Sequence, residues 1–261
     1  MTEQTTAMES TDNVAENQQN SAQAVSGEQL DDGSMSITKH LEELRSRLIK
    51  CLLAVAVGSV ICWAFVEDIM HYLTLPAGKL YYLQPAEAFF TYIKVAVAAG
   101  FLLALPVVFF HVWRFFLPAL TPKERMVLGI IVPSSVLLFF VGLGFSFFLV
   151  LPAALKFFLS FGDADLAAMF SIGKYFDFVL TFILPFGFVF ELPLIITVLG
   201  KMGIVTSAML KKYWRIVVFL SFVLGAFITP TPDIFTQSMI ALPMIGLYGL
   251  SYGIVKYVIR N

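Results

Sequence analysis

Long apolar segments separated by short polar connections dominate the chain from about residue 48 onward. An α-helix rises roughly 1.5 Å per residue, so about 20 apolar residues cross the ~30 Å hydrocarbon core of a bilayer. The pattern therefore predicts an all-α integral membrane protein with six transmembrane helices. These spans are expected at about 48–66, 89–113, 126–150, 177–200, 214–229 and 234–255.

The fourth span contains an acidic residue. Between Asp177 and Lys201 lie 23 residues, about 34 Å of helix, with Glu191 near the middle. An ionised carboxylate at that depth costs from roughly 2.5 to more than 10 kcal/mol. Glu191 is therefore a protonated carboxyl paired with a neighbouring helix, a proton relay, or a docking point.

The fifth and sixth spans are predicted to be short. Only 14 residues separate Arg215 from Pro230, which gives about 21 Å of helix. Pro243 interrupts the sixth span. In the third span, Gly142 and Gly144 are expected to allow close packing against a neighbouring helix.

The two ends of the chain are polar. Residues 1–35 contain no Lys or Arg and show no apolar period. They are predicted to form a disordered acidic and polar tail, and they lack the basic and apolar regions of a signal peptide. Residues 36–50 form an amphipathic helical pattern that leads into the first span. The membrane domain is thus expected over 36–256, with a short C-terminus at 257–261.

Basic residues are distributed unequally between the two sides of the predicted helices. Thirteen Lys and Arg lie on the side of the N-terminus and four on the other. The positive-inside rule therefore places both termini in the cytoplasm, with Trp113 and Trp214 at the inner interface and Trp63 near the outer one. The outer connections, 67–88 and 151–176, are expected to be loops, the first a compact cap because of its Pro and Gly.

Composition supports the same class of protein. Apolar residues make up 59% of the chain and charged residues 13%, against about 25% charged in soluble domains. The net charge is −1 and no dense basic tract is present, which excludes a nucleic-acid-binding function. The two cysteines, Cys51 and Cys62, lie in one predicted helix about 16 Å apart, too far to form a disulfide bond there.

The sequence contains no motif for catalysis or cofactor binding. GxxxxGK[ST], HExxH and GxSxG are all absent, and His40, His71 and His111 lie in three different segments. We therefore expect no catalytic residues, no metal and no cofactor, and predict that the protein is not an enzyme. Any work would draw its energy from a partner, a gradient or the substrate.

Two carboxylates on the inner side have alternative interpretations. Glu43 and Arg47 are spaced i, i+4, which is typical of a solvated helix pair that contributes about 0.2–0.5 kcal/mol. Glu124 is, by default, a loop carboxylate beside two cations. Alternatively, Glu43 and Glu124 face one another and bind a cationic ligand, for which bidentate guanidinium groups are well suited.

On the outer side, Asp233 and Gln237 flank the turn between the last two spans. Asp233 is placed to accept hydrogen bonds from the free N–H groups that open the sixth helix. We therefore expect a capping role for Asp233.

Four stretches resemble the TatC family, the large polytopic subunit of the twin-arginine protein translocase. They occur in the family's order and span nearly all of residues 36–255, whereas the N-terminal tail has no counterpart. The stretches are HLEELRSRL at 40–48, VWRFFLPALTPKER at 112–125, FVFELP at 188–193, and TPTPDIFTQ at 229–237 followed by ALPM at 241–244.

The resemblance implies a receptor and scaffold in the bacterial inner membrane that uses the proton motive force. It would bind twin-arginine signal peptides of folded precursors, assemble TatA/TatB-type single-span partners, and form a hetero-oligomer of several copies in membrane lipid. By position, the implied signal-peptide site comprises Glu43, Arg45, Phe115, Pro118 and Glu124. Glu191 corresponds to the intramembrane docking carboxylate. The implied outer functional positions are Pro76, Asp233 and Gln237.

A second interpretation belongs to another class: an ion- or proton-coupled secondary transporter with Glu191 as the relay. Such transporters usually have two related halves with broken helices at matching positions. The first three spans differ from the last three in length and in loop pattern. The sequence therefore favours the translocase interpretation.

Overall fold

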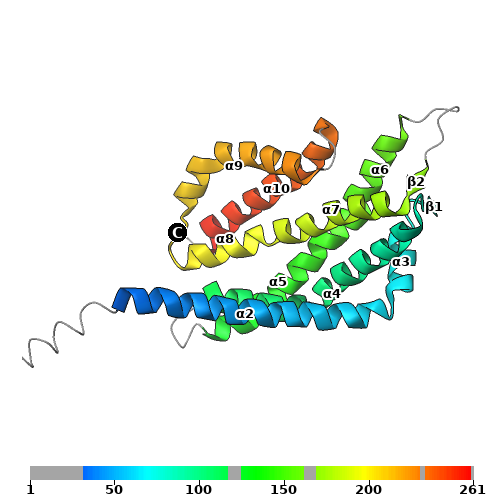
Figure 1. The fold of residues 1–261 in the computed structure, drawn as a ribbon. Coiled ribbons are helices and arrows are strands. Elements are labelled where there is room, and N and C mark those ends of the chain that lie inside the picture. The colour runs from blue at the N-terminus through cyan, green and yellow to red at the C-terminus, as the bar shows by residue number, and fades with distance from the viewer. Residues whose placement is uncertain (1–31, 117–124, 162–168, 230–232, 260–261) are drawn as a thin grey trace, which may run out of the picture. The chain divides into compact units, whose positions relative to one another are not determined.

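The computed structural model describes residues 32–116, 125–161, 169–229 and 233–259, and it is nearly all helical. The contacts divide the chain after Lys50 into two units. The elements are α2 (Asp32–Trp63), α3 (Val66–Thr74), β1 (Leu80–Tyr81), α4 (Pro85–Phe116), α5 (Arg125–Phe145), the π-helix η1 (Ser146–Val150), α6 (Leu151–Leu159), β2 (Phe170–Ser171), α7 (Ile172–Phe190), α8 (Leu192–Lys201), α9 (Ser207–Ile228), α10 (Ile234–Ile254) and the π-helix η2 (Val255–Ile259) (Figure 1).

Five helical runs in the described residues are long and apolar enough to cross a membrane. Each coincides with a span predicted from hydropathy, and most extend beyond the predicted limits. The runs are Leu41–Trp63, Pro85–Phe115, Gly129–Leu159, Ile172–Lys201 and Ile234–Ile259.

The remaining predicted span falls in α9. This helix has 22 residues, but its first half carries Lys211, Lys212 and Arg215, so the uncharged part is short. The run containing α10 has 26 residues, against 31, 31 and 30 in the three runs that precede α9. The last two helices are thus shorter than these three, as the sequence predicted.

The third run continues where a loop was expected. Helix α5 passes through η1 into α6, which ends at Leu159 rather than near residue 150. The N–H of Leu151 donates to the carbonyl of Ser146, five residues back, as in a π-helix. Pro152, within the connection expected to be a loop, stands in the first turn of α6, where its missing N–H is tolerated.

Helix α5 packs closely along α7. A Cβ at Gly142 would lie 2.5 Å from the carbonyl oxygen of Phe186, so only glycine permits this approach. A Cβ at Gly187 would meet the ring of Phe139, which is fully buried. Gly144 has nothing within 4 Å of its Cβ position. The packing prediction is therefore confirmed for Gly142 and wrong for Gly144.

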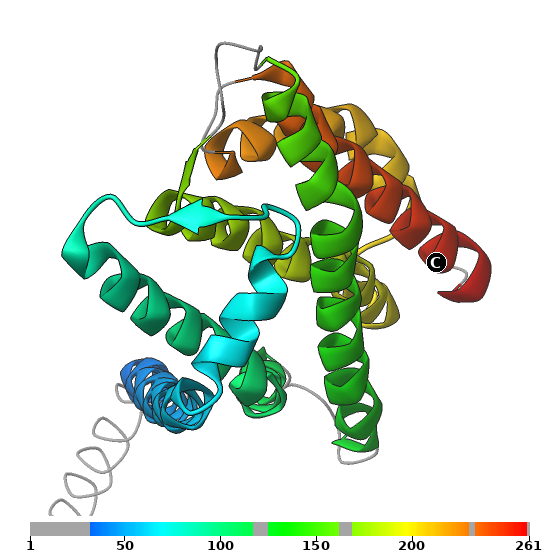
Figure 2. The same cartoon turned by 90° about the vertical axis from the view of Figure 1, so that its right-hand side faces the viewer.

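The two connections that the sequence predicts on the outer side form an ordered cap. Strands β1 and β2 pair in parallel, with Leu80 opposite Phe170 and Tyr81 opposite Ser171. The hydroxyl of Tyr175 on α7 donates to the carbonyl oxygen of Leu73 on α3 at 2.7 Å. Figure 2 shows α3 and the strands toward the viewer at one end of the Cys51–Asn261 unit.

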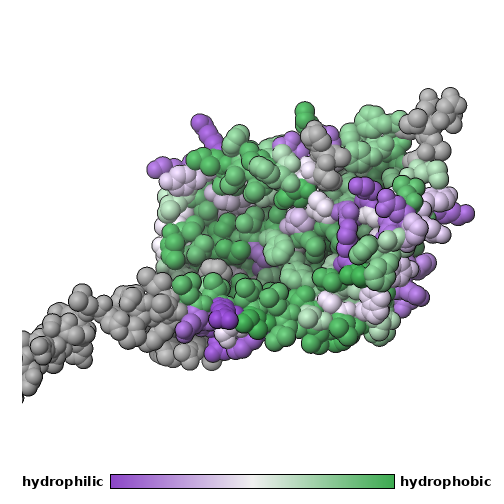
Figure 3. All heavy atoms as spheres, in the orientation of Figure 1, coloured by the Kyte–Doolittle hydropathy of each residue, from purple (hydrophilic) through white to green (hydrophobic). Residues whose placement is uncertain are grey.

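The Cys51–Asn261 unit exposes many large apolar side chains. Hydrophobic residues cover the middle of the face seen in Figure 3, over α7, α9 and α10, and hydrophilic residues gather at the end with β1 and β2. Phe227, for example, is 84% exposed. Such a surface suits contact with lipid tails and would be a liability in water.

Candidate functional site

Glu191 occupies a break in the fourth apolar run. Helix α7 ends at Phe190 and α8 begins at Leu192, with Pro193 in the first turn of α8, where its missing N–H is tolerated. The backbone hydrogen bonds continue across the break: the Glu191 N–H donates to Phe188 O at 3.1 Å, and the Ile195 N–H donates to Glu191 O at 2.9 Å. The break thus turns one carboxylate inward without interrupting the run.

The side chain of Glu191 is buried among three helical segments. It is 4% exposed, and neither carboxylate oxygen has a hydrogen bond of normal length to the described residues. The polar side chain beside this carboxylate is Ser135 on α5. The Ser135 hydroxyl oxygen accepts a hydrogen bond from Trp113 Nε1 on α4 at 2.7 Å.

This arrangement leaves hydrogen-bonding capacity inside the membrane. A buried polar group without a partner is unfavourable, so it binds a proton, a polar side chain or water wherever one is accessible. Trp113 is buried at 8% exposure, so its ring packs within the bundle; its level at the inner interface stays a prediction. The sequence did not predict that Ser135 and Trp113 lie near Glu191, because a single serine or tryptophan in an apolar span is common.

In the N-terminal unit, Glu43 and Arg47 form the expected i, i+4 pair on α2. Arg47 Nε donates to Glu43 Oε1 at 3.0 Å, and Nη2 contacts the same oxygen. Arg45 is exposed on the same helix. The helix-pair interpretation is confirmed, and the carboxylate already binds a guanidinium.

The other predicted members of the signal-peptide site lie at the end of α4 and beyond it. Phe115 is half-buried in the last turn of α4. Pro118 and Glu124 lie outside the described residues. The pairing of Glu43 with Glu124 around a ligand therefore stays a prediction.

At the outer turn, Asp233 caps α10 as predicted. Its Oδ1 accepts a hydrogen bond from the Thr236 N–H at 2.8 Å. Gln237 Nε2 donates to the Phe222 carbonyl on α9 at 2.7 Å, and its backbone lies against Gly225. The two residues thus fasten the start of α10 to α9.

Pro76 lies in the turn after α3 and is half-buried. It lines an open cleft of about 530 Å³ together with Phe147, Phe148 and Lys156 from η1 and α6. The cleft places Pro76 at the outer end of the Cys51–Asn261 unit, beside the third helical run.

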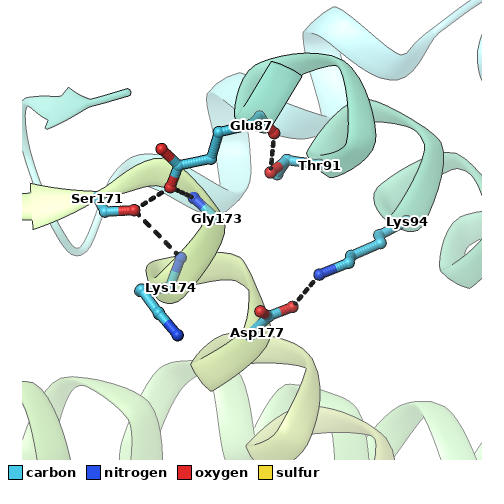
Figure 4. A network of polar contacts seen from close by, with 7 residues as sticks. All are labelled: Glu87, Thr91, Lys94, Ser171, Gly173, Lys174 and Asp177. Atoms are coloured by element: carbon cyan, nitrogen blue, oxygen red, sulfur yellow. Dashed lines mark hydrogen bonds and ion pairs between the residues drawn. The ribbon is translucent and has the colours of Figure 1, made fainter. Parts of the chain in front are cut away.

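A polar network at the same end was missed by sequence reasoning. The Glu87 carboxylate near the start of α4 accepts hydrogen bonds from the Gly173 N–H at 2.9 Å and from the Ser171 hydroxyl (Figure 4). It also accepts one from the Leu83 N–H at 2.7 Å. A carboxylate in the first turn of a helix is a local capping signal. Ser171 and Gly173, which lie 84 and 86 positions from Glu87, leave no local signal.

Among the described residues, no group of three His, Cys, Asp or Glu side chains is placed to hold a metal ion. The acidic and polar groups that the structure brings together lie inside the helical bundle and at its outer cap.

The fold and the buried carboxylate define a polytopic α-helical membrane protein. The sequence model of the family described as "Sec-independent protein translocase protein (TatC)" matches residues 39–243. The chain belongs to this TatC family.

Individual relatives agree with the assignment. The chain is 44% identical to a Sec-independent protein translocase protein TatC of a Synechocystis species, over 87% of this chain and 90% of that protein. It is 40% identical to the chloroplastic TATC of Arabidopsis thaliana, over 84% and 65% respectively. A crystal structure of a twin arginine translocase receptor, TatC, is 37% identical, with a TM-score of 0.75 over 83% of this chain and 98% of that chain. The all-α fold is confirmed, and the translocase interpretation prevails over the solute transporter.

Proposed function

We propose that the chain is the receptor and scaffold subunit of a twin-arginine translocation system. It binds twin-arginine signal peptides of folded precursors and assembles TatA/TatB-type single-span partners in a hetero-oligomer. The observation that carries the proposal is the likeness to the crystal structure of a twin arginine translocase receptor over 98% of that chain. The proton motive force supplies the energy, and the protein's role is binding rather than catalysis.

The signal-peptide site comprises Glu43, Arg45, Phe115, Pro118 and Glu124. Glu43 is exposed and bound to the Arg47 guanidinium within its own helix. The Glu43 side chain is 43% exposed and that of Arg47 12%, so the carboxylate is the accessible partner of the pair. An arginine of a signal peptide can therefore reach the Glu43 carboxylate from solvent, and Glu124 offers the second carboxylate.

The docking site for a partner helix centres on Glu191. Its carboxylate is buried beside Ser135 and lacks a normal hydrogen bond, so a polar side chain of an entering helix would satisfy it. Pro76, Asp233 and Gln237 support the outer end, where they shape the turns that such a helix would meet.

The protein lies in the bacterial inner membrane with both termini in the cytoplasm. The 13-to-4 distribution of basic residues supports this orientation. Residues 1–35 form a polar tail, 36–256 the membrane domain and 257–261 a short inner C-terminus. An epitope tag in the 67–88 connection should be accessible from outside, and one at residue 20 should not.

Photo-crosslinking in membranes tests the receptor function. A probe on a twin-arginine signal peptide should form adducts near residues 40–50 and 115–125, and a twin-lysine peptide should form few. Glu43→Ala and Glu124→Ala should reduce the adducts, whereas Glu67→Ala, an exposed carboxylate at the outer end, should not. Equal crosslinking of both peptides, or none in these segments, would contradict the proposed site.

A further inference from the structure

The start of α9 and the end of α10 enclose a small cleft. The Tyr248 hydroxyl on α10 donates to the Leu210 carbonyl on α9 at 2.8 Å, and both residues are buried together with Val255. Beside this contact lies a cavity of about 180 Å³. The basic cleft, as we call it, is lined by Leu210, Lys211, Trp214, Tyr248, Gly249 and Tyr252.

Positive charge around the basic cleft lacks acidic partners. From residue 201 to the C-terminus the sequence has six Lys and Arg but one acidic residue, Asp233, which caps the opposite end of α10. Among the described residues, no ion pair involves the basic side chains at the cleft. These side chains are Lys211, Lys212 and Arg215 on α9 and Lys256 on η2.

Lys256 contacts an aromatic ring that lines the basic cleft. Its Nζ lies 5.7 Å from the ring centre of Tyr252, which lines the cleft, and 5.1 Å from that of Tyr257. Such contacts are cation–π interactions, and among the described residues no acidic side chain pairs with this ammonium. Lys211 and Lys256, from different elements, thus flank one aromatic side chain.

The surface next to the basic cleft is apolar. Trp214 is 51% exposed, and Ile216 and Phe219 follow it on α9 with 59% and 68% exposure. Trp and Tyr beside basic residues are typical of the level where lipid head groups meet acyl chains. The cleft therefore opens at a head-group level and continues onto a lipid-facing helix.

We propose that the basic cleft is a binding site for one anionic phospholipid. Lys211 and Lys256 bind the phosphate and the head group, and the upper part of an acyl chain lies against Trp214 and Gly249. A cavity of 180 Å³ is below the ~300 Å³ of small-molecule pockets, so it holds part of a lipid rather than a whole free ligand. Basic pockets between transmembrane helices commonly bind anionic head groups. The inference depends on the membrane location of the chain and is independent of the proposed receptor function.

A lipid is favoured over an acidic protein segment because the cleft is lined mainly by apolar and aromatic groups. An acidic peptide would need polar partners for its backbone, and apart from Lys211 the lining side chains offer only two tyrosine hydroxyls and an indole. The Tyr248 hydroxyl already donates to Leu210.

Two glycines on α10 provide a matched pair of variants. A Cβ at Gly249, in the lining, has nothing within 4 Å, so Gly249→Leu places a side chain in the cleft. Gly246, one turn earlier, also has nothing within 4 Å but does not line the cleft. Both substitutions replace glycine by a better helix former, so neither should unfold α10.

Native mass spectrometry of the full chain tests the proposal. The purified protein is offered phosphatidylglycerol and phosphatidylcholine in equal amounts, and retained lipid is counted for folded variants with unchanged circular dichroism. The wild type should retain phosphatidylglycerol preferentially. Lys211→Gln and Lys256→Gln should each reduce that retention roughly fivefold, and Lys174→Gln, at the other end of the unit, should not.

The cleft variants test the acyl-chain contact. Gly249→Leu should reduce retention of phosphatidylglycerol with all basic residues in place, and Gly246→Leu should behave as wild type. Excess inorganic phosphate should fail to displace the lipid, since the chain contributes to binding. Equal retention of both lipids by the wild type, or no change in Lys211→Gln, Lys256→Gln and Gly249→Leu, would overturn the proposal. Displacement by inorganic phosphate would show a simple anion site and would also overturn it.

Discussion

The ammonium of Lys94 on α4 lies 2.6 Å from the carboxylate of Asp177 on α7, although 83 positions separate the two residues. Two turns closer to the start of α4, Glu87 binds the Gly173 N–H and the Ser171 hydroxyl (Figure 4). Two polar contacts thus join α4 to α7 and its preceding strand. They differ in kind, because Glu87 binds backbone groups and the Lys94–Asp177 pair is half-exposed.

Glu87→Ala should loosen the outer cap more than Lys94→Gln. Glu87→Ala removes the acceptor shared by the Leu83 and Gly173 N–H groups, whereas a surface ion pair contributes about 0–1 kcal/mol. We expect faster hydrogen exchange at Gly173 and a thermal midpoint several degrees lower in Glu87→Ala. The thermal midpoint of Glu87→Gln, which keeps an oxygen acceptor, should lie between those of Glu87→Ala and the wild type. Equal midpoints for Glu87→Ala and Lys94→Gln would show that the cap does not depend on Glu87.

Gly142→Ala should destabilise the bundle, and Gly144→Ala should not. The first methyl would collide with the Phe186 carbonyl, which cannot move without shifting α7, and overpacking of this kind costs about 1–3 kcal/mol. Gly144 faces open space, so alanine should be neutral or stabilise the helix by up to about 1 kcal/mol. Thermal unfolding of the two variants and the wild type in the same detergent measures both changes in stability. Similar losses in the two variants would contradict the close approach of α5 to α7 at Gly142.

Asp233→Ala should remove the N-cap of α10 and destabilise the protein by about 0.5–2 kcal/mol, since the Thr236 N–H loses its acceptor. Asp233→Asn keeps the acceptor oxygen and should lie near wild type in thermal unfolding. Export assays on the same variants separate two roles. If Asp233→Asn unfolds like wild type but exports poorly, the negative charge has a function beyond capping.

Hydropathy predicts the helices because the signal is local. A span needs only an apolar run, so the Pro85–Phe115 and Ile172–Lys201 runs are visible in the sequence alone. The continuation through Pro152 is not, because a π-turn depends on how neighbouring helices pack. Likewise, the capping role of Asp233 follows from its position before a helix, whereas Gln237 binds a carbonyl on α9 that no local pattern indicates.

The candidate site divides in the same way. The depth of Glu191 follows from counting residues, and its pairing state depends on α4 and α5. Ser135 and Trp113 look ordinary within apolar spans, and only the packing of three helical segments places them beside the carboxylate. The Glu43–Arg47 pair, four residues apart on one helix, was predictable from spacing alone.

Glu43→Ala and Arg47→Ala should have the same effect on stability, but only Glu43→Ala should lower the affinity for a twin-arginine peptide. Each removes the same i, i+4 pair, which contributes about 0.2–0.5 kcal/mol, so both midpoints should stay near wild type. Glu43→Ala should also lower the affinity for a twin-arginine peptide roughly ten- to hundredfold, since a hydrogen bond to a charged group is lost. Titration with labelled peptide measures this difference. Identical affinities for the two variants would exclude Glu43 as a ligand of the peptide.

Glu191 should be more important for export than for stability. Its buried carboxylate has no normal hydrogen bond among the described residues, so Glu191→Met removes an unsatisfied polar group and should leave the protein as stable as wild type, or more stable by about 1–3 kcal/mol. If a partner helix binds this carboxylate, Glu191→Met and Glu191→Ala should abolish export with signal-peptide binding intact. Glu191→Gln retains hydrogen-bonding groups and should be milder.

Export of a folded reporter, thermal unfolding and peptide binding, measured on the same Glu191 variants, distinguish docking from a proton relay. Docking needs a polar side chain at this depth, which glutamine provides, whereas a relay needs a group that titrates, which glutamine does not. Ser135→Ala is the matched control, because it alters the polar group beside the carboxyl and keeps the acid. A Glu191→Gln variant as inactive as Glu191→Ala, with normal peptide binding, would favour the proton relay.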